Sequence, residues 1–195
     1  WMCDIGRFDY HWVEGTARLR RPMVRTSTGL EPLAWHDVGP RLRDAIQGAG
    51  SADPSSVRFL VSAHAATEDL FVLKDVVTGL LGGDGMAAVT VTWKNSAKKQ
   101  PAGAKFIVPS TDAPNVNGAK DLGLAVVAKP DGDADLSALR TAIDQGRVAV
   151  LYILDPGPDG SMGDVSWIVE ARKSGRLPVI IYEGDDPANS GRITY

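Results

Sequence analysis

Short apolar runs of strand length recur along the chain, separated by segments with helical periodicity. Residues 57–62 and 177–182 form such runs, and 148–154 is the cleanest of them. Runs that are apolar on both faces are typical of buried parallel strands. Residues 87–93 alternate valine with threonine, which also favours a strand. Two weaker segments are also predicted: a brief strand at 106–108 and an extended segment at 124–128.

Four segments between these runs have apolar residues at helical spacing. The predicted helices cover about 35–47, 68–81, 136–145 and 164–174. Their predicted N-caps are Asp37, Thr67, Asp135 and Asp164. The first residue of the first helix is not fixed by the pattern, because an early start would place Pro40 inside the helix.

Alternating strands and helices predict a three-layer α/β fold with a mostly parallel sheet of right-handed βαβ units, Rossmann-like in character. The remaining segments have no sustained period. An extended segment is predicted between Pro22 and Pro32, a lysine-rich surface loop at 94–105, and a loop of turn residues at 109–123. The tail from Glu183 is polar.

Composition restricts the function classes. The chain has 195 residues, 44% hydrophobic and 23% charged, with a formal net charge of −3. It can bury a real core, and its bulk charge does not suggest nucleic acid. No signal peptide or apolar run of roughly 20 residues is visible. The single cysteine excludes an intrachain disulfide framework and fits a reducing cytosol. Because the chain opens on Trp1, we expect a piece of a longer protein, cut upstream.

A glycine-rich loop is the first candidate site. Gly157, Gly160 and Gly163 lie between a predicted strand and a predicted helix, the usual setting for a phosphate. Two prolines in the loop remove N–H donors, and three aspartates place negative charge where a phosphate would lie. A plain turn is therefore favoured over a nucleotide loop.

Other reactive residues are isolated. His11, His36 and His64 do not approach a metal-ligand spacing, although His64 follows a predicted strand, where α/β sites gather. Ser96 and Lys99 have the spacing of a serine nucleophile motif without its helix or partner motifs, so chance is favoured. Cys3, judged on residue type alone, is a small buried hydrophobe.

The neighbours of Cys3 change that interpretation. In order along the chain come Trp1-Met2-Cys3-Asp4-Ile5-Gly6-Arg7-Phe8-Asp9-Tyr10, Arg18-Leu19, Pro22-Met23-Val24-Arg25 and Pro32-Leu33-Ala34-Trp35. This series resembles the start of the molybdopterin-oxidoreductase-like region in G subunits of bacterial NADH:quinone oxidoreductase (respiratory complex I). Later segments are similar to the same family, namely Ser62 to Asp69, Asp112 to Gly123, and Val150 to Leu154 with Gly163-Asp164-Val165. The resemblance covers residues 1 to about 184.

The resemblance implies a metal ligand. Cys3 matches the last cysteine of a four-cysteine set that binds a [4Fe–4S] cluster, and thiolates are the ligands of such clusters. The other three cysteines would lie upstream of Trp1, so this chain alone should not bind the cluster. No cysteine follows the helix that ends near Leu81, where catalytic molybdopterin enzymes carry a molybdenum ligand, and Ser96 is a poor substitute. Molybdopterin is therefore expected to be absent.

The resemblance also implies a function. We expect a fragment of an electron-transfer subunit that scaffolds an iron–sulfur cluster chain between NADH and quinone, with no complete active site. The alternatives are a fragment of a catalytic molybdopterin (bis-MGD) oxidoreductase such as a formate dehydrogenase, and a free-standing nucleotide-binding α/β module.

The expected organisation follows. Residues 1–34 would end an iron–sulfur subdomain, 35–184 would form the α/β domain, and 185–195 would be a divergent tail. The partners would be other subunits of a membrane-associated respiratory complex, with NADH and quinone as indirect partners. The location would be cytoplasmic and peripheral to the inner membrane, without a membrane span or nucleic acid.

Overall fold

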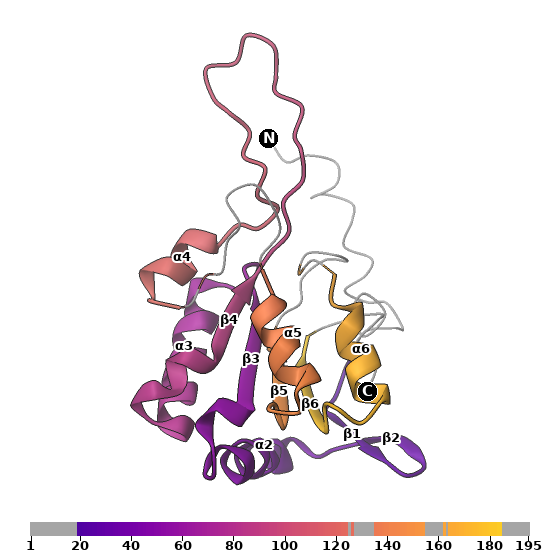
Figure 1. Ribbon diagram of the computed structural model, residues 1–195. Coiled ribbons are helices and arrows are strands. Elements are labelled where there is room, and N and C mark those ends of the chain that lie inside the picture. The colour runs from indigo at the N-terminus through magenta and orange to yellow at the C-terminus, as the bar shows by residue number, and fades with distance from the viewer. Residues whose placement is uncertain (1–18, 125, 127–134, 155–161, 163, 185–195) are drawn as a thin grey trace.

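A four-stranded parallel sheet forms the centre of the molecule (Figure 1). The computed structural model describes residues 19–124, 126, 135–154, 162 and 164–184. The strands are β3 (Val57–Ser62), β4 (Val89–Thr92), β5 (Val150–Leu154) and β6 (Val179–Glu183). Their order is β4-β3-β5-β6, and every neighbouring pair is parallel. The four runs predicted as strands are therefore confirmed.

Helices cover both faces of this sheet (Figure 1). They are α2 (Trp35–Gly50), α3 (Thr67–Leu81), α4 (Val116–Asp121), α5 (Ser137–Asp144) and α6 (Ser166–Lys173). Short 3-10 helices, η2 (Pro54–Ser56) and η3 (Gly83–Ala88), precede β3 and β4. The predicted three-layer α/β fold is confirmed.

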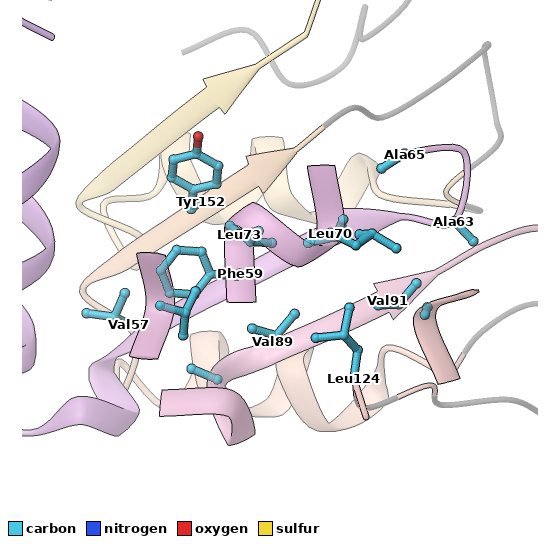
Figure 2. Close-up of a cluster of buried hydrophobic side chains, with 14 of the residues drawn as sticks. Val57, Phe59, Ala63, Ala65, Leu70, Leu73, Val89, Val91, Leu124 and Tyr152 are labelled. Atoms are coloured by element: carbon cyan, nitrogen blue, oxygen red, sulfur yellow. The ribbon is translucent and has the colours of Figure 1, made fainter. Parts of the chain in front are cut away.

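Alternate strand residues enter two separate cores. One face of β3 carries Phe59 and Val61, which pack with residues of α2, α3 and α4 (Figure 2). The other face carries Leu60, which packs with Ile153 of β5 and residues of α5 and α6. Burial on both faces explains why these strands are continuous apolar runs.

The N-caps differ from the predictions at all four of these helices. Ala34 is the N-cap of α2, so Asp37 lies in the first turn and Pro40 lies inside the helix. Ala66 is the N-cap of α3, so Thr67 is its first helical residue and bonds elsewhere.

At α5 and α6 the N-caps are Leu136 and Val165, so the prediction of Asp135 and Asp164 as N-caps is wrong by one residue at each helix. The carboxylates of Asp135 and Asp164 each accept a hydrogen bond, at 3.0 Å, from the backbone N–H of the first helical residue, Ser137 or Ser166. This bond satisfies one of the N–H groups that have no partner within a helix.

Three connecting segments differ in part or in full from the predictions. The segment between Pro22 and Pro32 is extended as predicted, but it forms an antiparallel hairpin of β1 (Met23–Thr26) and β2 (Gly29–Pro32). The predicted loop 109–123 contains α4, which we missed. The predicted strand 106–108 is wrong, because Phe106 and Ile107 are exposed and join no strand.

Of the predicted extended segment 124–128, the described residue Val126 forms an isolated parallel bridge with Val91. Within the described part of the chain, no helix has the length and apolar character needed to cross a bilayer.

A candidate functional site at the carboxyl edge of the sheet

The strand order reverses at β3. The chain passes from β3 outward to β4, then returns to the other side of β3 to form β5. Ligands of open α/β sheets bind outside the carboxyl ends of strands at such a switch point. The loops that follow β3 and β5 are therefore the first place to look for a site.

The loop after β3 is closed by its own hydrogen bonds. The backbone N–H of Ala63 donates to the Thr92 carbonyl at 2.9 Å, and that of Ala65 donates to the Ser62 carbonyl at 3.1 Å. The N–H of His64 donates to Ser62 Oγ at 3.1 Å. Ala63 and Ala65 are fully buried. These three N–H groups are thus already used within the protein.

Asn115 clamps this loop from the start of α4. Its backbone N–H donates to the Ala63 carbonyl at 3.0 Å, and its Nδ2 donates to the Ala65 carbonyl at 2.8 Å. Its Oδ1 accepts from Thr67 Oγ1 at 3.1 Å. One side chain therefore joins α4 to both the β3 loop and the first turn of α3.

The surroundings of the residues after Asn115 explain why glycine and alanine occur there. A Cβ at Gly118 would lie 2.1 Å from Asn115 Oδ1 and 2.8 Å from Thr67 Oγ1, so only glycine fits beside the clamp. Ala119 is fully buried in the core. Gly123 has φ +75°, in the left-handed region that favours glycine. The pattern Asn-x-x-Gly-Ala was therefore the signal for α4, although its turn-forming residues predicted a loop.

His64 and Asp112 lie together beside this clamp. His64 Nε2 is 2.8 Å from the Asp112 carbonyl oxygen, so the histidine links two segments that are far apart in the sequence. Hydrogen bonds from Lys98 and then Ser96 hold the pKa of the Asp112 carboxyl below its usual range. His64 therefore acts as a structural link, and Ser96 is hydrogen-bonded to the Asp112 carboxylate beside Lys98.

A buried threonine connects β4 to the segment after β5. Thr92 Oγ1 donates to the Met162 carbonyl at 3.1 Å, and both residues are almost fully buried. The candidate glycines of that segment, Gly157, Gly160 and Gly163, lie outside the described residues, as do Cys3 and His11. Among the described residues, no three His, Cys, Asp or Glu side chains gather as a metal site would require.

Comparison with known proteins gives one informative similarity. No family model matches the chain. A G subunit, numbered 2, of the NADH-quinone oxidoreductase of Rhizobium meliloti (strain 1021) is 30% identical over 80 residues. The matched segment is 41% of this chain and 9% of the length of that relative. The match supports a distant relation to this kind of subunit.

Proposed function

We propose that this chain is a segment of an electron-transfer subunit of an NADH:quinone oxidoreductase, in which it supports a chain of iron–sulfur clusters. The observation that carries the proposal is the similarity to a G subunit of such an enzyme over 80 residues. The ordered series around Cys3, which resembles the same family, is consistent with it. The partners would be other subunits of a membrane-associated complex, on its cytoplasmic side.

The geometry at the carboxyl edge of the sheet fits a scaffold. Three residues of this edge stabilise the fold. Asn115 holds the loop after β3 by hydrogen bonds, Gly118 lets the Asn115 side chain approach closely, and Ala119 is buried in the core. His64 bonds a backbone carbonyl oxygen. The described residues at this edge therefore hold loops in place, which is what a support for neighbouring redox centres requires.

Cys3 is the residue that would contact a redox centre. Four cysteine thiolates bind a typical [4Fe–4S] cluster, and this chain has one cysteine. Its thiolate is chemically suited to the cluster, but one ligand cannot hold it. In this proposal Cys3 supplies one ligand, and cysteines outside these 195 residues supply the others.

Electron paramagnetic resonance of the protein that carries this segment tests the role of Cys3. Cys3→Ser should remove or strongly perturb the signal of one reduced [4Fe–4S] cluster while other cluster signals remain. His64→Gln is a suitable comparison variant, because it alters the sheet edge without touching a thiol. An unchanged set of cluster signals in Cys3→Ser would contradict the ligand role.

A second candidate is a catalytic molybdopterin oxidoreductase. The observation in its favour is that β3 and β5 are neighbours at the switch point of the sheet, and a dinucleotide cofactor could lie beyond their carboxyl ends. Against it, the N–H groups of Ala63, His64 and Ala65 are engaged, and Glu68 and Asp69 place negative charge at the start of α3. Stoichiometric molybdenum or tungsten, with pterin fluorescence after acid release, would favour this candidate and overturn the first.

The third candidate, a free-standing nucleotide-binding module, predicts binding through Gly157, Gly160 and Gly163. Calorimetric titration of the 195-residue chain with ATP or NADH tests it directly. Saturable binding that Gly160→Asp abolishes would favour this candidate over an electron-transfer segment. No heat of binding at millimolar nucleotide would remove it.

A further inference from the structure

Residues 94–112 form a projecting arm between β4 and α4 (Figure 1). Two limbs run antiparallel at its base, where Asn95 bridges Thr111 and the Ser96 N–H donates to the Ser110 carbonyl at 2.8 Å. Farther out, the Gln100 side chain bonds both the N–H and the carbonyl of Val108, at 2.9 and 3.0 Å. The arm thus has a defined shape although it contains no regular strand.

The surface of this arm is both apolar and basic. Phe106 is 66% exposed and Ile107 is 83% exposed. Residues 94–111 contain four lysines and no carboxylate, and one of the four, Lys98, pairs with Asp112 at the base. An exposed apolar pair flanked by uncompensated cations is unusual for a surface that faces only water.

The outer face of α3 has the complementary character. Phe71, Val72 and Val76 are each roughly half exposed there, while the inner face of the helix is buried against the sheet. The helix also carries exposed carboxylates at Glu68, Asp69 and Asp75. Its one cation, Lys74, donates to the Leu122 carbonyl at 2.9 Å. This face is therefore apolar and acidic.

We propose that the arm of one copy of this chain docks on the outer α3 face of a second copy. Phe106 and Ile107 would bury against Phe71, Val72 and Val76, and the arm's lysines would pair with the α3 carboxylates. The arm leaves β4, and α3 begins, at the same carboxyl edge of the sheet (Figure 1). A reciprocal exchange of two arms would close a two-fold dimer, the commonest form of homo-oligomer.

The end of this arm favours a protein surface over a lipid surface. The turn at its end is Pro101 to Ala104, where the Ala104 N–H donates to the Pro101 carbonyl at 3.2 Å. Phe106 and Ile107 lie behind this turn and behind Lys105, so they would not be the first residues to enter a bilayer. The proposal does not depend on the function proposed above.

Sedimentation velocity of the full chain over a concentration series tests the dimer. The wild type should shift from monomer to dimer below about 100 µM. The double variant Lys99→Glu/Lys105→Glu should raise the dissociation constant about tenfold or more, because it places carboxylates opposite carboxylates. Glu68→Lys/Asp75→Lys should do the same from the other side, with circular dichroism to check that α3 is intact.

The decisive sample is a chain that carries all four charge reversals. It should regain the dimer, because each surface again meets its opposite charge, whereas a general loss of structure would not be repaired. A chain that stays monomeric up to about 100 µM would overturn the proposal. So would a dimer indifferent to the reversals, or a monomeric chain whose arm binds vesicles of phosphatidylserine and phosphatidylcholine.

Discussion

Two neighbouring loops leave the same edge of the sheet and have opposite characters. The loop after β3 is short and buried, and its N–H groups are used by Ser62 and Thr92. The arm after β4 extends away from the body and exposes its largest apolar side chains. Because both begin on adjacent parallel strands, the difference comes from the loops themselves. The sheet supplies a fixed edge, and loop sequence decides whether that edge is closed or presents a surface.

The largest expected contrast comes from the same substitution in each region. Phe59→Ala on β3 removes a ring that is 1% exposed and packs at 5.5 Å between centroids against Tyr152. It should lower the free energy of unfolding by about 3–5 kcal/mol. Phe106→Ala in the arm should change that free energy by no more than about 0.5 kcal/mol. Urea denaturation in dilute solution measures both, and similar losses would contradict the comparison.

A glycine pair tests the closed loop alone. Gly118→Ala should destabilise by about 1–3 kcal/mol, because the new Cβ meets the Asn115 amide that bonds Ala65. At Gly48 of α2 an added methyl would have nothing within 4 Å, so Gly48→Ala should stabilise by about 0.5–1 kcal/mol. Thermal melts of the two variants should therefore shift in opposite directions. A rise in both melting temperatures would show that the clamp has room.

The features that could be predicted from the sequence are those that depend on local pattern, and the features that depend on distant contacts could not. Phe59, Leu60 and Ile153 lie in apolar runs whose burial is a local property, so the strands and the fold class could be predicted. The helix α4 could not, since its signal is a glycine whose role depends on Thr67 and Asn115, which are far apart in the chain. Thr67 illustrates the same limit, because its hydroxyl bonds Asn115 rather than the helix start that local rules favour.

The sequence indicated the edge of the sheet where the candidate site lies, but not the hydrogen bonds that form it. The strand that precedes His64 indicated the correct edge of the sheet, and His64 does lie there. Its partner is a carbonyl 48 residues away, which no spacing rule could identify. Only residues 94–105 of the arm were predicted as a lysine-rich surface loop. The defined shape of the arm rests on Gln100 and Val108, a pairing between a side chain and the backbone.

A pH-dependent prediction concerns Tyr152 of β5 and Glu183 of β6 in the same sheet. The Tyr152 hydroxyl donates to the Glu183 carboxylate, and burial together with that bond raises the pKa of the phenol. Since the folded pKa is raised, this stabilisation is complete below the ordinary value of 10.0 and is lost as the pH rises above it. Tyr152→Phe should lower stability by about 1 kcal/mol near neutral pH. The difference between wild type and variant should shrink above pH 10.0, and a constant difference would contradict this account.

The smallest expected effect probes the arm's internal order. Gln100→Ala removes the side chain that holds Val108 from both sides, yet the bonds are exposed and should change global stability by no more than about 0.5 kcal/mol. Local opening is a separate quantity, so the Val108 amide should exchange with deuterium about 2- to 10-fold faster. The Asn115 amide, bonded to the Ala63 carbonyl in the closed loop, is the internal reference and should not change. Hydrogen exchange by NMR on monomeric chain measures both amides. Equal acceleration at Val108 and Asn115 would mean that the arm and the closed loop open together, and the two loops would then form one cooperative unit instead of two.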